Sequence, residues 1–291
     1  MERILFGDNQ FFGINHMSEE KARQQAMRFQ DIDNIVDVLQ AALQAGAGGF
    51  MCTTHDTIEK IADRVRADPA MWEGFTFYPG MPYAHKYANA VTELGYFDAL
   101  RKFLPSDGLM DAMLRGSKAV LGRDIEGIIT LLIDAEMKMF RGLETPVIFL
   151  QNVVTDLVQG LGIVDAFRIF AEHVRSRYNA EPGFITMNLP MLLPMLKQAG
   201  IENPIVCANV NKIAFRMSGG IDGYRAAVAK HPARVIAMSV LASGGIRPRE
   251  AIEWVVNEPY VKSILFGASS RANIENTTML IRELDAQRQL R

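Results

Sequence analysis

Residues 235–271, VIAMSVLASGGIRPREAIEWVVNEPYVKSILFGASSR, decide the fold class of this chain. An apolar segment at Val235–Val240 runs into the loop Ser243-Gly244-Gly245, and a second one at Ser263–Phe266 ends in Gly267-Ala268-Ser269-Ser270. A helical pattern separates the two segments. Short apolar runs that alternate with helices and end in glycine loops are typical of βαβ units with parallel strands.

The same alternation runs through nearly the whole chain. It has 291 residues, 49% of them hydrophobic, which suits one barrel of typically about 250 residues. We predict an α/β protein with a single domain over 1–291, a (β/α)8 TIM barrel. Its eight strands are expected at 4–6 (extended through 11–14), 49–53, 75–78, 147–150, 184–187, 205–208, 235–240 and 263–266.

The connection between the third and fourth predicted strands is about twice as long as a usual barrel crossover. Residues 80–146 contain an apolar stripe at helical spacing from Ile125 to Phe140, after a second helix-like stretch. We therefore expect a helical insertion over 80–146 between strands 3 and 4. It could form a lid over the barrel mouth, form a dimer surface, or simply pack beside the barrel.

Composition narrows the class of partner. The net charge of −2 and the dispersed basic residues argue against a nucleic-acid partner. The first residues, MERILFGDNQ, lack the apolar core of a signal peptide, and no apolar run approaches the ~20 residues of a membrane span. Two distant cysteines indicate a reducing compartment. We expect a cytoplasmic protein with a small-molecule ligand and no membrane partner. Whether the chain forms a homodimer is left undecided by the sequence.

The glycine loops suggest an anion site. In barrels of this kind the loops after strands 7 and 8 commonly bind a phosphate group. Gly244, Gly245 and Gly267 would let backbone N–H groups approach an anionic or phosphorylated ligand closely. The alternative is that these glycines only form tight turns. We favour the phosphate site because two glycine loops end consecutive strands.

Polar residues gather at the predicted carboxyl ends of the strands, where barrel enzymes place their chemistry. Asp8 and Asp156 are among them, without an assigned role. The candidate catalytic residues are His16, His55, Asp56, Cys52, Asn152 and Lys212. The candidate substrate-binding residues are Asn15, Tyr83, His85, Asn188 and Asn209.

Individual roles follow from side-chain chemistry. His16 or His55 suits general acid–base catalysis because histidine titrates near neutral pH. Asp56 could instead be a helix N-cap, with Glu59 completing a capping box. Lys212 could form a Schiff base if it is desolvated. The alternative, which we favour, is that Lys212 points to solvent or to a phosphate. No metal site is predicted, because the spacing of the histidines matches no known metal signature.

The segment ILFGASSRANIENT (264–277) is similar to the last-strand cofactor loop of the aldo-keto reductase family. Residues 185–211 and 48–65 resemble the family more weakly. The resemblance implies the same barrel and a loop that binds the adenosine ribose and 2′-phosphate of NADP. The residues that the resemblance assigns to the cofactor are Ser269, Ser270, Arg271, Asn273 and Asn276.

The family's catalytic tetrad is not matched. Cys52 or Thr53 stands at the position of its strand-2 aspartate, and no tyrosine follows within a few residues. Asn152 replaces the strand-4 histidine, and Lys86 lies well beyond strand 3. The resemblance thus implies the fold and the cofactor loop, without the family's proton donor.

Three functions fit these residues. We favour a lyase or isomerase that abstracts a proton beside a carbonyl group, with His55 or His16 as the base. Asn152, Asn188 and Asn209 would orient the substrate and stabilise an oxyanion. The first alternative is an NADP-dependent oxidoreductase similar to the aldo-keto reductases, with His55 or Tyr83 as proton donor. The second is a ligand-binding barrel without catalysis. The cofactor stays unknown, with NADP as the candidate.

Overall fold

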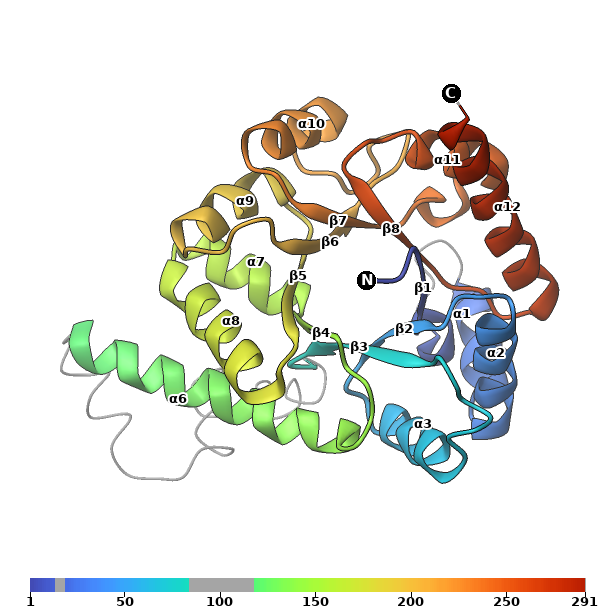
Figure 1. Cartoon of the computed structure of the whole chain (residues 1–291), viewed down its shortest axis with the longest axis horizontal. Coiled ribbons are helices and arrows are strands. Elements are labelled where there is room, and N and C mark those ends of the chain that lie inside the picture. Colours follow the sequence, from blue (N-terminus) through green and yellow to red (C-terminus); the bar gives the residue numbers. More distant parts are fainter. Residues whose placement is uncertain (14–18, 84–117, 291) are drawn as a thin grey trace.

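The computed structural model describes residues 1–13, 19–83 and 118–290, which form a closed barrel of eight parallel strands (Figure 1). Each strand pairs with its neighbours in chain order, and β1 closes the barrel against β8. The predicted (β/α)8 barrel is confirmed. The strands are β1 Ile4–Gly7, β2 Gly49–Thr53, β3 Thr76–Met81, β4 Val147–Leu150, β5 Glu181–Thr186, β6 Ile205–Asn209, β7 Arg234–Met238 and β8 Val261–Phe266.

Helices surround the strands (Figure 1). The α-helices are α1 Glu19–Arg28, α2 Ile32–Gln44, α3 Asp56–Ala67, α6 Lys118–Met137, α7 Asn152–Gly160, α8 Val164–Tyr178, α9 Leu189–Gln198, α10 Gly220–Lys230, α11 Pro248–Val256 and α12 Arg271–Gln289. The short 3-10 helices are η1 Asn9–Phe12, η2 Lys138–Phe140 and η3 Ala242–Gly244. Within the described residues, no helix is long and apolar enough to cross a membrane.

Alternating side chains divide the core into two layers. Leu5, Met51 and Tyr78 belong to a buried cluster that fills the barrel. Their neighbours Phe6 and Phe50 belong to the larger cluster between strands and helices. Successive side chains of a strand point to opposite faces, so each strand contributes to both layers. Burial of each large apolar side chain contributes about 1.5–3 kcal/mol.

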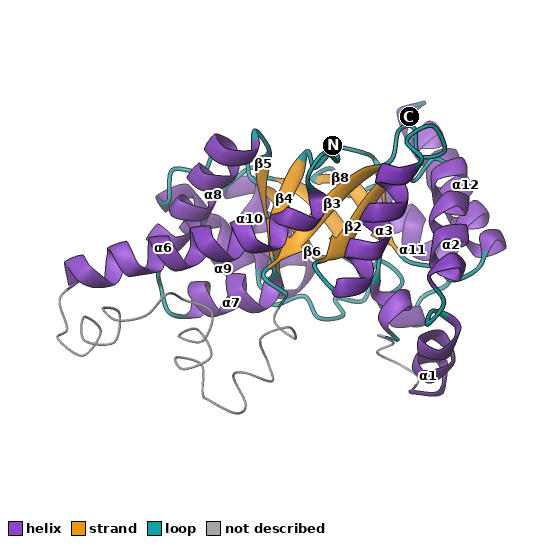
Figure 2. Cartoon of the chain, turned by 90° about the horizontal axis from the view of Figure 1, so that it is seen from below, coloured by secondary structure: helices purple, strands orange, loops and turns teal. Residues whose placement is uncertain are grey.

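All eight carboxyl ends open on one side, because the strands are parallel. Figure 2 shows α1 and α7 on this side and the N-terminus on the opposite side. We call this end the mouth. Loops that follow the strands lie here, so the fold brings residues that are distant in sequence into one region.

Several boundaries differ from the prediction. The expected extension of the first strand is wrong over 11–13, because Asn9–Phe12 form η1 and Gly13 caps it with a φ of 63°. Residue 14 lies outside the described residues. Strand β3 runs on to Met81, because Pro79 and Gly80 still align with β2. Helix α7 after β4 was not predicted.

Part of the expected insertion is described. The connection from Met81 to Val147 includes α6 and η2, whereas residues 84–117 lie outside the described part. Helix α6 packs on α8, as Figure 1 also shows. The lid and dimer roles of 80–146 stay predictions.

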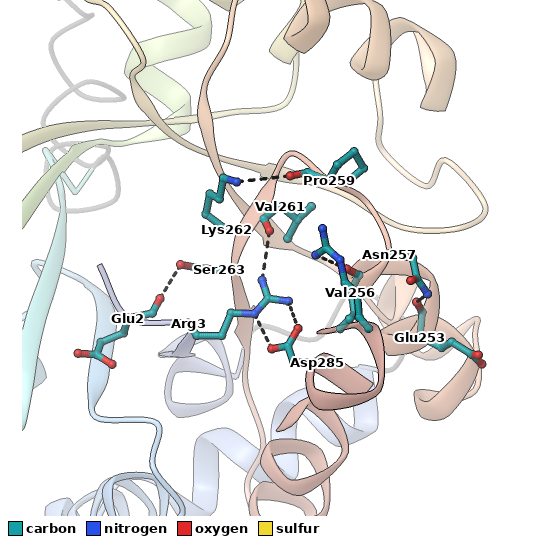
Figure 3. A network of polar contacts seen from close by, with 11 residues as sticks. Glu2, Arg3, Glu253, Val256, Asn257, Pro259, Val261, Lys262, Ser263 and Asp285 are labelled. Atoms are coloured by element: carbon teal, nitrogen blue, oxygen red, sulfur yellow. Dashed lines mark hydrogen bonds and ion pairs between the residues drawn. The ribbon is translucent and has the colours of Figure 1, made fainter. Parts of the chain in front are cut away.

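A polar network closes the barrel at the end opposite the mouth (Figure 3). The Arg3 guanidinium donates to both carboxylate oxygens of Asp285 on α12, at 2.7 and 2.6 Å, and to the Val261 carbonyl of β8 at 3.2 Å. The Ser263 hydroxyl donates to the Glu2 carbonyl, and the Ile264 N–H donates to the Arg3 carbonyl at 2.9 Å. The first strand is thereby held to the last strand and the last helix.

Replacing Arg3 with alanine should lower the free energy of unfolding by about 1–3 kcal/mol, because a two-pronged, half-buried ion pair is lost. Urea unfolding followed by circular dichroism measures this. Arg64→Ala is the control: its ion pair with Asp33 is exposed on both sides, so the change should stay under about 1 kcal/mol. Equal effects of the two substitutions would contradict a special role for Arg3.

Candidate functional site

Two buried carboxyl groups lie at the mouth over β1–β3. Asp8 follows β1, and its Oδ2 accepts the Thr53 N–H at 2.7 Å and the Thr53 hydroxyl at 2.8 Å. Glu136 of α6 accepts the Thr54 hydroxyl and, at 3.2 Å, the Tyr83 N–H. The adjacent residues Thr53 and Thr54, at the end of β2, thus bind two carboxyl groups that are far apart in the sequence, those of Asp8 and Glu136.

Asp8 is only 6% exposed. Burial raises the pKa of its carboxyl group, and the hydrogen bonds from Thr53 offset this in part. No ion pair joins Asp8 to a cation within the described residues. Burial, and secondarily the Asp8 charge, also raises the pKa of Tyr83. Asp8 is thus an acid whose proton is held more firmly than in water.

His55 lies beside this cluster as the N-cap of α3. Its Nδ1 accepts the Thr57 N–H at 3.0 Å, so the neutral imidazole carries its proton on Nε2. The ring lies 4.4 Å from that of Phe12 and 5.7 Å from that of Tyr83, measured between centroids. Asp56 is the first residue of α3, so its expected role as N-cap is wrong: the extended backbone at His55 places the cap one residue earlier.

Two candidate catalytic residues have surroundings unsuited to nucleophilic chemistry. Cys52 is buried in the layer between strands and helices, and burial with the nearby Asp8 charge raises the pKa of its thiol well above the usual range. Lys212 forms a 2.6 Å ion pair with Glu250, and both side chains are almost half exposed. A Schiff-base lysine needs desolvation. Lys212 instead faces solvent, as we favoured.

Asparagines and a third carboxyl group occupy the mouth over β4–β6. Asp156 of α7 accepts the Thr186 hydroxyl at 2.5 Å and the Met187 N–H at 3.0 Å. Asn188 caps α9 through the Met191 N–H at 3.4 Å. Asn152 is the first residue of α7, and the Asn209 side chain donates to the Arg216 carbonyl. The structure thus gives Asn188 and Asn209 local structural bonds.

The glycine loops after β7 and β8 are explained by local packing. The Gly244 N–H donates to the Leu241 carbonyl at 2.8 Å, and the Gly245 N–H donates to the Ala242 carbonyl at 3.1 Å. A Cβ at Gly267 would lie 2.2 Å from Oε1 of Gln10, so a larger residue there would have to displace the Gln10 side chain. Of the three glycine amides expected to bind phosphate, those of Gly244 and Gly245 are already used within the turn.

A hollow of about 350 Å³ lies beside the start of α12. Its lining brings Arg271 together with Arg28 of α1 and with α2, and the remaining lining residues are Asp37, Val38, Gln40 and Ala41. Arg271 donates to Gln44 at 2.9 Å and pairs with Glu275 at 3.5 Å. Ser270 caps α12 through the Asn273 N–H. Ser269 precedes this cap, and Asn276 lies in α12.

Some expected site residues cannot be placed, and others were missed. Asn15, His16 and His85 lie outside the described residues. Glu136 was not predicted, although an acidic residue within the apolar sequence IITLLIDAEMKMF was a usable signal. Arg28 and Arg216 carried no signal. In the described part of the chain, no three histidine, cysteine, aspartate or glutamate side chains are placed to bind a metal ion.

No protein-family model matches the chain, and no curated protein matches it in sequence. Solved structures share its fold. One is a Pseudomonas aeruginosa protein provisionally assigned as an aldo-keto reductase (TM-score 0.62, 12% identity, 97% of this chain and 90% of that one). Others are an aldo/keto reductase from Brucella melitensis (0.54, 10%, 98% and 94%) and a Gox0644 variant in complex with NADPH (0.53, 10%, 98% and 88%). The resemblance to aldo-keto reductases is confirmed for the fold, and the unmatched tetrad stays a prediction.

Asp8→Asn should change how stability depends on pH. Because burial raises the pKa of Asp8, the folded chain binds more protons than the unfolded chain above the ordinary pKa of 3.8. The free energy of unfolding of the wild type should therefore fall as pH rises through that window, by about 1.4 kcal/mol per unit of pKa difference. Asparagine can still accept from Thr53 but does not titrate, so the variant should gain stability relative to the wild type.

Urea unfolding between pH 4 and pH 8 measures this slope. Asp222→Asn, at a fully exposed carboxylate, is the control and should leave the slope unchanged. A constant loss of stability in Asp8→Asn at every pH would show that the carboxylate serves only as a structural acceptor.

Proposed function

We propose that the chain is an NADP-dependent oxidoreductase that acts on carbonyl compounds and uses a proton donor different from that of aldo-keto reductases. One observation carries the proposal. The cofactor-like segment 264–277 begins α12 beside a hollow that Arg271 and Arg28 line together. The shared fold with a barrel solved in complex with NADPH agrees with it.

The lyase or isomerase interpretation has lost its main supports. It relied on free glycine amides for a substrate phosphate, and Gly244 and Gly245 use theirs within the turn. It also drew on Lys212 as an electrophile, and Lys212 is paired with Glu250 in solvent. The oxidoreductase interpretation needs neither feature.

The hollow beside α12 suits a phosphate group on chemical grounds. Arg271 and Arg28 bring two guanidinium groups to it, against the single carboxylate of Asp37. Guanidinium binds phosphate through paired hydrogen bonds. A phosphate on the cofactor's ribose would compete with Glu275 for Arg271, and this requirement would favour NADP over NAD.

The mouth must supply a proton to the carbonyl oxygen of the substrate. NADPH, when bound, supplies the hydride to the carbonyl carbon. We assign this proton to the Nε2–H of His55, since Nδ1 accepts from Thr57 and leaves Nε2 as the donor. The ring then regains a proton from solvent. Tyr83 is a weaker acid than an ordinary tyrosine, since burial and the Asp8 charge raise the pKa of its phenol.

Arg271→Ala should weaken NADPH binding at least about tenfold and leave NADH binding unchanged, because it removes a charged contact to the 2′-phosphate. Titration followed by tryptophan and nicotinamide fluorescence measures both affinities. Arg168→Ala is the matched control: Arg168 is also exposed and also paired with a glutamate four residues on, but it lies on the outer helix α8. Absence of saturable NADPH binding to the wild type would refute the proposal.

His55→Asn should lower the rate of NADPH-dependent reduction about 100-fold or more while preserving the fold, because asparagine is a good N-cap but a poor proton donor. Tyr83→Phe should change the rate by less than about tenfold. The readout is NADPH oxidation with a panel of aldehydes, together with the melting temperature of each variant. The reverse ranking of the two variants would assign the proton to Tyr83.

A further inference from the structure

A second hollow, of about 420 Å³, opens at the mouth where β5 and β6 end. The strand β7 separates β6 from β8, so this hollow lies apart from the one beside α12. Its lining includes one guanidinium and two thioethers. The lining residues are Met187, Ala214, Arg216, Met217 and Ser218.

The loop that carries Arg216 is held from below by two buried asparagines. The Asn209 side chain, 1% exposed, donates to the Arg216 carbonyl at 2.9 Å. The Asn211 side chain accepts the Phe215 N–H at 2.7 Å and donates to the Phe215 carbonyl at 2.9 Å. These bonds fix the backbone on both sides of the peptide between Phe215 and Arg216. The core therefore fixes the backbone from which the exposed Arg216 side chain extends.

The backbone of this loop is strained. Ala214 and Arg216 have φ values of 56° and 54°, in the left-handed region that disfavours side chains other than glycine. Such a conformation persists only where its surroundings enforce it. The two asparagines provide that enforcement here.

The Arg216 guanidinium lies beside an aromatic ring, and no counter-charge faces it in the part of the chain that the structure describes. It lies 5.3 Å from the centroid of the Phe215 ring. Within the described residues, no carboxylate forms an ion pair with it, whereas Arg225 and Arg234 near the same strands are both paired with glutamate. Asp156, whose carboxyl group lies in the same half of the mouth, is already bonded to Thr186 and Met187. A planar guanidinium in this state suits a carboxylate or phosphate group.

We propose that this hollow binds the anionic group of the substrate, a carboxylate or a phosphate, through Arg216. Met187 and Met217 would pack against the apolar part of the same molecule, since thioether side chains adapt to irregular surfaces. Helix α10 begins just beyond Ser218 without a side-chain cap. The partial positive charge of its N-terminus also favours a negatively charged ligand. The identification of the ligand as the carbonyl substrate rests on the proposed function, whereas the anion site itself does not.

Calorimetric titration of the full chain with benzoate, inorganic phosphate and benzyl alcohol tests the site without turnover. We expect benzoate or phosphate to bind the wild type, and Arg216→Ala to weaken that binding about tenfold or more. Arg216→Lys should restore part of it, because lysine keeps the charge but loses the paired geometry. Arg141→Ala, at an exposed arginine just before β4 at the other end of the barrel, should change nothing. Benzyl alcohol should show no dependence on Arg216.

Steady-state kinetics with two aldehydes distinguishes a failure of this inference from a failure of the proposed function. With NADPH, Arg216→Ala should raise the KM for 4-carboxybenzaldehyde about tenfold and leave benzaldehyde unaffected. No Arg216-dependent binding of benzoate or phosphate would overturn the anion site. If Arg216→Ala weakened NADP⁺ binding more than benzoate binding, Arg216 would be assigned to the cofactor's diphosphate. That result would also overturn the proposed substrate site. Arg216-dependent benzoate binding without any turnover would support the site and refute the reductase.

Discussion

The pairing of β1 with β8 is the constraint on which the mouth of this barrel depends. Ile4, Leu5 and Phe6 align with Ile264, Leu265 and Phe266, and Arg3 secures this seam through Asp285. Without closure, Asp8 and Gln10 after β1 would have no fixed relation to Gly267 after β8. The pairing of β1 with β8, which Arg3 secures at the end opposite the mouth, therefore fixes the relative positions of the residues that follow these two strands at the mouth.

The mouth has two chemically different halves. Over β1–β3, the buried Glu136 carboxylate accepts the Tyr83 N–H, the His55 ring lies against that of Tyr83, and the Asp8 carboxyl lacks a cation among the described residues. Over β5–β6, a strained loop presents Arg216 beside Met187 and Met217. The two halves agree with the proposed reduction of carbonyl substrates that carry an anionic group, with His55 proposed as the proton donor and Arg216 proposed as the anion-binding residue. Buried charge in the first half costs stability, and the packed aromatic layer around the barrel offsets that cost.

Local signals predicted some of this site and missed the rest for physical reasons. His55 and Tyr83 were predicted because they follow strands, and strand ends meet at the mouth. Glu136 was missed because it comes from α6, far along the chain, and reaches Thr54 and Tyr83 only after folding. Anion binding by the glycines stays a prediction, and the sequence could not show that the N–H groups of Gly244 and Gly245 already donate to Leu241 and Ala242.

The sequence by itself determined the alternation of strands and helices, because apolar periodicity and glycine stops are local properties of the chain. It thereby determined the barrel, and the segment 264–277 carried the likeness to a cofactor loop. Only the tertiary structure decided which polar side chains are buried, paired or left without a counter-charge. Those properties depend on contacts between residues such as Asp8 and Thr53, or Asn209 and Arg216, whose meeting follows from closure of the barrel.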